Sequence, residues 1–193
     1  FAAFARLVAR DGFVTRAHAG RFTRAALDPA RVLVVSNALA ARNEEDWYRP
    51  VLSAFDTAEV RAVEGWVREG GALLLVADHM PFGGAAAELA AAFGVLLTDG
   101  FAQDAAGQMN FRLRRGDGRV RAHPVTDGRG PEERVDSVAV YTGEAFRAAM
   151  PVDTLLLVAP GGSVLLPQVA WEFSPLTPAI RSDGMLVGAA LRH

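Results

Sequence analysis

The chain has 193 residues, of which 51% are apolar and 22% charged, and its formal net charge is −2. This length suits one domain with a core of its own, and the balanced charge gives no sign of a nucleic-acid-binding surface or an acidic tail. All 20 basic residues are arginine and cysteine is absent, which excludes a thiolate nucleophile, a disulfide framework, an iron–sulfur cluster, a Schiff-base lysine and a P-loop.

The first third of the chain predicts a helix and then two strands. Apolar residues recur at helical spacing over residues 1–10. A short strand is expected over 13–15, and the apolar run 31–36 is typical of a strand buried on both faces of a parallel sheet. No initiator Met or signal peptide precedes the helix, and no apolar run approaches the roughly 18–20 residues of a membrane span. We interpret the chain as a single domain, 1–193, truncated at both ends.

The clearest helix signal follows a long polar loop over residues 37–53. Asp56 and Glu59 have the spacing of a capping box, and the flanking Phe55 and Val60 are placed to form a hydrophobic staple. This pattern predicts a helix that runs to Arg68 and stops before a glycine pair. After it, a second buried strand, a turn, an alanine-rich helix and a short strand are expected, in the order 72–77, 78–82, 84–93 and 95–97.

The second half of the chain has the alternating pattern of antiparallel strands. Residues 109–114 alternate, and the turn at 116–118 is expected to return the chain as a hairpin strand over 119–121. Residues 135–141 alternate as well. Two apolar runs complete the expected strands, 155–159 and 185–191.

Buried strands that alternate with helices predict an α/β fold. We expect a three-layer sandwich with a mainly parallel sheet, like that of flavodoxin, and a β-rich second half containing an antiparallel hairpin. Such sheets place their ligand sites at the carboxyl ends of the strands, so the residues that follow each buried strand are the candidates for function.

The string GGALLLVADHMPFGGAAAELAAAFGVLL, residues 70–97, resembles class I glutamine amidotransferase-like domains. Together with the SNALA that ends the first buried strand, the likeness covers roughly residues 31–97 and points to an uncharacterised bacterial family with this fold. The resemblance implies an amidotransferase-like three-layer domain. Asp78 stands where the amidotransferases place their cysteine nucleophile, so the resemblance also implies a domain without glutaminase activity.

Asp78 and His79, which follow the 72–77 strand, are the candidate catalytic pair. A charged pair directly after an apolar strand is where α/β enzymes place acids, bases and metal ligands. The alternative is that Asp78 caps the following turn and His79 packs under Phe82. Asn37 closes the preceding strand, so we expect it beside Asp78, where it would hold a substrate hydroxyl or satisfy loop backbone.

Candidate ligand-binding residues come from two loops. Glu44, with acidic neighbours, would supply a carboxylate and Trp47 a stacking surface, a combination that suits a carbohydrate; a solvated loop is the alternative. Gly161 and Gly162 would offer backbone amides to an anion, or form a turn that requires a positive φ.

The remaining motifs are weak. His123 is the distant histidine that a triad or a metal set would need, but no G-x-S-x-G, H-x-H or H-E-x-x-H spacing is present, so neither a metal site nor a cofactor is predicted. Four arginines of the expected hairpin would form an anion site or the solvated face of an edge strand. They are Arg112, Arg114, Arg119 and Arg121.

Two functions from different classes follow from these residues. The first is a ligand-binding domain without glutaminase activity that holds a small molecule, such as a carbohydrate, at the carboxyl edge of the sheet. The second is a hydrolase, with metal assistance as one form, in which Asp78 is the base or ligand beside His79. A shared pocket with Asn37 and a loop carboxylate would favour the hydrolase, whereas a capping Asp78 and a packed His79 would favour binding.

Overall fold

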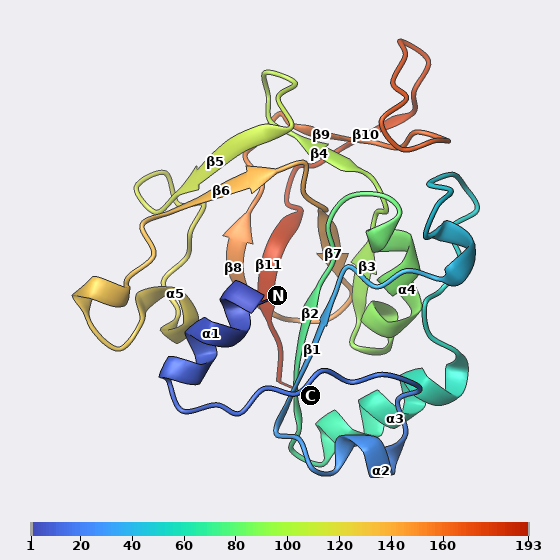
Figure 1. Cartoon of the computed structure of the whole chain (residues 1–193). Helices are drawn as coiled ribbons and strands as arrows, with labels where there is room; N and C mark the ends of the chain where they lie inside the picture. Colours follow the sequence, from blue (N-terminus) through green and yellow to red (C-terminus); the bar gives the residue numbers. More distant parts are fainter. Residues whose placement is uncertain (1, 193) are drawn as a thin grey trace.

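A parallel pair of strands forms the centre of the first half of the molecule. The computed structural model describes residues 2–192, and in it β1 (Val32–Ser36) pairs with β2 (Ala72–Val76) in the register Val32↔Ala72 to Ser36↔Val76. Helices α3 (Thr57–Arg68) and α4 (Phe82–Ala92) lie on one side of this pair (Figure 1). Their apolar residues pack with the inward side chains of both strands into one core, which includes Val35, Val63, Trp66, Leu73 and Leu89.

The other named strands are antiparallel, so the predicted mainly parallel three-layer sandwich is wrong. Only β1 and β2 pair in parallel among the described residues. After β3 the connections carry no helix longer than four residues, so the helix that usually forms a parallel crossover is missing from the described chain and the strands pair with reversed direction. The antiparallel sheets are, in spatial order, β3 (Val95–Leu97), β7 (Phe146–Ala148), β11 (Leu186–Ala190) and β8 (Asp153–Leu157); then β10 (Ala179–Arg181), β9 (Ser163–Leu165) and β4 (Phe101–Gln103); and β5 (Asn110–Arg114) with β6 (Ser137–Tyr141).

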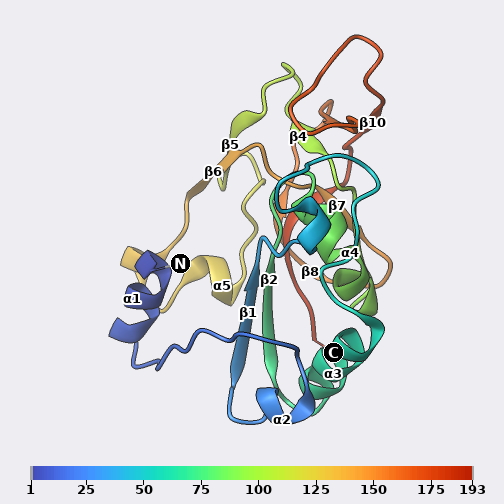
Figure 2. The same ribbon diagram turned by 45° about the vertical axis from the view of Figure 1, so that its right-hand side comes forward.

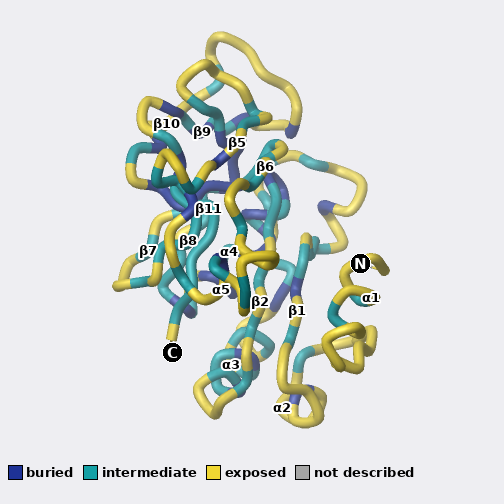
Figure 3. The backbone as a smooth tube through the Cα atoms, turned by 90° about the vertical axis from the view of Figure 1, so that its left-hand side faces the viewer, coloured by how far each residue is buried: buried dark blue, intermediate teal, exposed yellow. Residues whose placement is uncertain are grey.

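One face of the parallel pair is uncovered. Val32, Val34, Leu74 and Val76 are between 38% and 43% exposed, so β1 and β2 are buried on one face, in contrast to the two-face burial predicted from their composition. Helix α1 (Ala2–Arg10) lies on the side away from α3 and α4 but buries none of its residues (Figures 2 and 3). The apolar runs therefore predicted the two strands correctly. They did not indicate whether helices cover one face of the strand pair or both.

The two valines in the middle of β1 test this one-sided burial. We expect Val35→Ala to lower the free energy of unfolding by about 2 kcal/mol, because Val35 is 6% exposed and its methyl groups fill the core. Val34→Ala should cost less than about 1 kcal/mol, because Val34 faces outward. Both variants lose the same strand propensity, so the difference between their free energies of unfolding, measured by chemical denaturation, reports burial alone. If the two variants lost the same amount of stability, the outer face would be covered in solution.

Helix α3 begins as the sequence predicts. Asp56 accepts a hydrogen bond from the Glu59 N–H at 2.9 Å, and Glu59 accepts one from the Asp56 N–H at 3.1 Å, which completes the capping box. The second Glu59 oxygen accepts from the Phe22 N–H and so ties the preceding segment to the helix. At the other end Gly71 lies against the Trp66 ring, where a Cβ would approach ring carbons to 2.4 Å, so only glycine fits there.

Two local predictions about strands are wrong. Residues 13–15 form no strand, and all three are exposed. The predicted hairpin does not form either: the turn before Arg119 is present, with Gly118 at φ 74°, but β5 pairs with β6, and Val120 instead bridges to Leu156 of β8. Alternation of apolar residues indicates a strand but does not select its partner, and β6 offers five matched residues where 119–121 offers three.

Short helical turns complete the described chain. They are α2 (Arg24–Leu27), α5 (Pro124–Asp127) and the 3₁₀ turns η1 (Ala41–Asn43) and η2 (Pro131–Glu133). Within residues 2–192, no helix has the length and apolar character needed to span a bilayer. Phe1, which the sequence places in the first helix, lies outside the described residues.

Candidate functional site

Asn37 and Asp78 lie together at the carboxyl ends of β1 and β2. The Asn37 side-chain oxygen accepts a hydrogen bond from the Asp78 N–H at 2.9 Å, and the Asn37 N–H donates to the Val76 carbonyl. Asn37 adopts φ 49°, a left-handed conformation that asparagine tolerates better than most residues. The neighbouring position inferred from the sequence is therefore the one found, and the amide oxygen of Asn37 is engaged with backbone.

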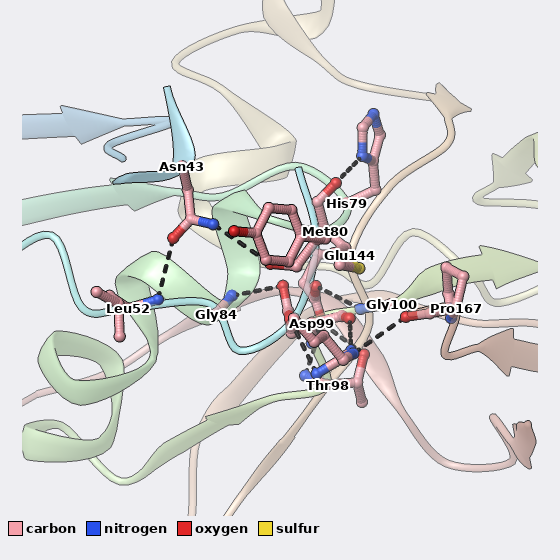
Figure 4. A network of polar contacts seen from close by, with 12 residues as sticks. Asn43, Leu52, His79, Met80, Gly84, Thr98, Asp99, Gly100, Glu144 and Pro167 are labelled. Carbon is pink, nitrogen blue, oxygen red and sulfur yellow. Dashed lines mark hydrogen bonds and ion pairs between the residues drawn. The ribbon is translucent and has the colours of Figure 1, made fainter. Parts of the chain in front are cut away.

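Asp78 and His79 point their polar groups at the local backbone. Asp78 Oδ1 accepts from the His79 N–H at 2.9 Å, and His79 Nδ1 lies 2.6 Å from the Met80 carbonyl, to which it donates (Figure 4). The His79 side chain is buried, with the residue 5% exposed. An imidazole in this position orders the turn before α4 and has little access to a substrate.

The ring of His79 is the centre of an aromatic cluster. It stacks on Phe101 with 4.4 Å between ring centroids, and it makes a T-shaped contact with Trp171 with 4.7 Å between centroids. Trp47 and Phe82 contact it from the other sides at about 6 Å. The sequence suggested that His79 would pack under Phe82, but the stacking on Phe101 and Trp171 joins residues too distant in the chain to be paired by inspection.

Two loops hold the outer part of the aromatic cluster. The Ala170 N–H donates to the Trp47 carbonyl and the Arg49 N–H donates to the Gln168 carbonyl, so residues 47–49 run antiparallel to 168–170. Asn43 is fully buried and stabilises the first of these loops. Its amide nitrogen donates to the carbonyls of Asp46 and Tyr48, and its amide oxygen accepts from the Leu52 N–H. The long polar loop over residues 37–53 is therefore held in place by these hydrogen bonds and supports the aromatic cluster.

Trp171 forms the exposed side of the aromatic cluster. It is 50% exposed, although Phe101 and His79 fix the position of its ring, and its backbone adopts φ 71°. Phe173 lies beside it at 6.5 Å and is 37% exposed. Sequence reasoning missed Trp171; the only signal was a WEF tripeptide inside a proline- and serine-rich loop.

A buried pair of acids, Glu144 and Asp99, lies at the amino end of α4. Glu144 Oε1 accepts from the Thr98 N–H, the Thr98 hydroxyl and the Asp99 N–H at 2.5–3.1 Å, and Oε2 accepts from the Gly100 N–H at 3.3 Å (Figure 4). Three successive N–H groups that converge on one carboxylate form a backbone nest. Glu144 fills this nest from within the chain, so no external anion is needed there.

Asp99 is the second buried acid. Its Oδ1 accepts from the Gly84 N–H at 2.7 Å, and its Oδ2 forms an ion pair with Arg49 Nη1 at 3.1 Å without hydrogen-bonding geometry. Arg49 also donates to the Asp99 and Pro167 carbonyls. The guanidinium therefore links three segments that are distant in the chain, and it is the positive charge nearest the acids.

Burial governs the ionisation of both acids. It raises the pKa of Glu144 to about 8, although hydrogen bonds from Thr98 oppose this, and the nearby Asp99 charge raises the pKa further. The pKa of Asp99 is also raised by burial, with the Gly84 N–H and the Arg49 charge acting in the opposite direction. A buried acid that keeps its proton near neutral pH, as Glu144 does, resembles a catalytic acid in its titration, but Glu144 and Asp99 are both 6% exposed and lack access to a ligand.

Glycines 83 and 84 permit this arrangement. A Cβ on Gly83 would lie 2.3 Å from Glu144 Oε2, and a Cβ on Gly84 would lie 2.8 Å from the Asp99 carboxyl carbon. The first turn of α4 can approach the acids only because both side chains are absent. From the sequence we expected a turn over 78–82 and a helix from Gly84, and we assigned the glycine pair no role beside a buried acid.

The other predicted site residues lie apart from Asn37 and Asp78. Glu44 is exposed, and among residues 2–192 its carboxylate has no hydrogen bond or ion pair. The Gly161 N–H donates to Asp183, with Gly161 at φ 80°, so its amide is already satisfied. A Cβ on Gly162 would meet the Gln103 carbonyl at 2.3 Å, which explains that glycine by packing. His123 caps α5.

No protein family, curated protein or solved structure matches the chain. The likeness to amidotransferase-like domains therefore stays a prediction that rests on the sequence of roughly residues 31–97. In the part of the chain that the structure describes, no three histidine, aspartate or glutamate side chains converge as metal ligands.

Proposed function

We propose that the protein is a ligand-binding domain that holds a small polyhydroxylated molecule, a carbohydrate in the simplest case, against Trp171. The single observation that carries this proposal is the half-exposed Trp171 ring, whose position is fixed by T-shaped contacts with His79 and Phe101. A flat apolar surface that is already ordered before binding loses little entropy when a ligand ring stacks on it. Phe173, which meets Trp171 at 6.5 Å and is 37% exposed, extends this surface.

Polar groups next to the aromatic cluster suit hydroxyl recognition. Asp78 adjoins His79, and its Oδ2 is not hydrogen-bonded to any residue that the structure describes. The Asn37 amide nitrogen is likewise without a partner in residues 2–192. One acceptor and one donor, held by their own backbone contacts, are each available to bond a ligand hydroxyl.

The same geometry offers less to the hydrolase alternative. In that alternative Asp78 is the base or metal ligand and His79 acts beside it, but the His79 ring is enclosed by aromatic rings and its Nδ1 is bound to the Met80 carbonyl. One Asp78 oxygen is already engaged by the His79 N–H. Binding without chemistry is therefore the function that these contacts support best.

Titration with a panel of mono- and oligosaccharides, followed by calorimetry and by NMR of the indole N–H signals, tests the proposal. We expect Trp171→Ala to weaken binding by more than about tenfold. Leu176→Ala is the matched control, because Leu176 lies in the same loop and is 90% exposed but is aliphatic. If no saccharide binds the unmodified protein, or if the two variants bind alike, the proposal is wrong.

The chain should also lack glutaminase activity, and Asp78→Cys should not create it. A cysteine at this position would need a neighbouring base and oxyanion donors, whereas the His79 ring is turned into the aromatic cluster. Ammonia release from glutamine measures this for both proteins. Release above the buffer rate by either protein would contradict the prediction.

A further inference from the structure

A cavity of about 690 Å³ is lined in part by Asp127 of α5 and Pro131 of η2. Helix α5 lies on the side of the molecule away from α4 (Figure 1). None of the cavity's lining residues belongs to the aromatic cluster or to the Asn37–Asp78 contact. Three arginines contribute to the lining, Arg115, Arg121 and Arg134, together with one acid, Asp127. The sequence had grouped Arg121 with a hairpin; the pairing of residues 119–121 with β8 brings it here instead.

Arg115 forms a fixed wall of the cavity. Its side chain is 14% exposed, and it donates to the carbonyls of Thr126 and Val135. Its Nη1 lies 2.9 Å from the Asp127 carboxylate. Because Arg115 compensates the charge of Asp127, the only acid in the lining is neutralised within the wall.

Arg121 carries charge that no acid of the described residues compensates, and Arg134 keeps free N–H donors although it pairs with Asp136. The Arg121 backbone is held on both sides, since its N–H donates to Leu155 and its carbonyl accepts from the Thr126 hydroxyl. Its guanidinium makes no hydrogen bond or ion pair within residues 2–192. Arg134 pairs through Nε with Asp136 at 3.1 Å, which leaves its two terminal nitrogens without partners in the described chain.

We infer that this cavity binds a small organic oxyanion, with its carboxylate or phosphate group between Arg121 and Arg134. Guanidinium groups bind such anions through paired N–H donors, and a cavity wall that carries net positive charge favours them over neutral molecules. Val120, Ala122 and Pro131 form the rest of the lining. Their apolar surface suits a ligand whose body is a ring or an aliphatic chain.

The other arginines of the predicted group do not take part. Arg112 donates to the Ser137 hydroxyl across the β5–β6 pair, and Arg119 donates to the Val158 carbonyl. Of the four arginines that the sequence suggested for an anion site, Arg121 alone lines the cavity. The arginines that line the cavity are therefore a different set from the four that the alternating pattern of the expected hairpin had grouped together.

Four probes test the inference by calorimetry at low ionic strength: phenyl phosphate, benzoate, inorganic phosphate and the neutral benzyl alcohol. We expect phenyl phosphate or benzoate to bind, the preferred one identifying the head group, inorganic phosphate to bind more weakly and benzyl alcohol not to bind. Arg121→Gln and Arg134→Gln should each weaken the preferred anion about tenfold. Arg121→Lys, which keeps the charge but loses the paired donors, should fall between them and the unmodified protein.

Arg112→Gln is the matched control, because it removes an exposed arginine outside the cavity and should leave anion binding unchanged. Thermal melts of all variants check that each is folded. Absence of binding by every anion, equal binding by Arg121→Gln, or equal binding of benzyl alcohol would overturn the inference. Saccharide binding at Trp171 should be unaffected in the arginine variants, so a failure here and a failure of the proposed function are separate results.

Discussion

Glu144→Ala should lower the free energy of unfolding by about 3–5 kcal/mol. The substitution removes the acceptor of four hydrogen bonds, and it leaves the N–H groups of Thr98, Asp99 and Gly100 without a partner in a dry site. Each unpartnered buried donor costs about 1–3 kcal/mol, and the lost side chain adds a cavity beside the first turn of α4. Denaturant unfolding at pH 6 measures the loss.

Glu88→Ala is the control for this experiment. Glu88 is on the exposed face of α4, and removing its side chain should change stability by less than about 0.5 kcal/mol. If Glu144→Ala were as mild as Glu88→Ala, water would be entering the nest and replacing the carboxylate, and the buried character of the acid pair would be contradicted.

The second large effect is a loss of stability as the pH rises. The pKa of Glu144 is raised from 4.5 to about 8 in the folded protein, so the folded state binds a proton that the unfolded chain has released. The contribution of this bound proton to the free energy of unfolding is therefore complete below about pH 4.5 and is lost as the pH rises through 8. Over this range the loss amounts to a total on the order of 3–5 kcal/mol. The pKa of Asp99 is raised as well, so its contribution has the same sign.

Unfolding free energies at a series of pH values between about 5 and 8 test the sign and the cause. The unmodified protein should become steadily less stable over this range, and Glu144→Gln should show a much flatter profile because it does not titrate. A profile that is flat or rises with pH in the unmodified protein would show that the nest holds Glu144 as a carboxylate.

Local signals in the sequence predicted local structure well. The Asp56–Glu59 capping box forms as its spacing indicates, and the runs VLVVS and ALLLV become adjacent parallel strands. Placing Asn37 beside Asp78 needed only the rule that parallel strands end at the same edge. These features depend on residues close in the chain, or on one strand pair, and pattern alone is enough for them.

Predictions that required a partner distant in the chain were wrong or were not made. The strand at 109–114 was given the nearest partner, whereas β6 pairs with it. Glu144 reaches the nest at Thr98–Gly100 across more than forty residues, and nothing in its own neighbourhood marks it as buried. Apolar alternation and charge report burial and exposure along the chain, but they contain no information about which distant segment supplies the contact.

The enthalpy of unfolding measured by calorimetry should depend on the buffer because of the buried Glu144. Near neutral pH its carboxyl keeps a proton in the folded protein and gives it up when the chain unfolds, so each molecule that unfolds delivers about one proton to the buffer. The measured enthalpy then includes the heat with which the buffer takes up that proton. It should be smaller in imidazole, which releases much heat on protonation, than in phosphate, which releases little, although the protein is the same in both.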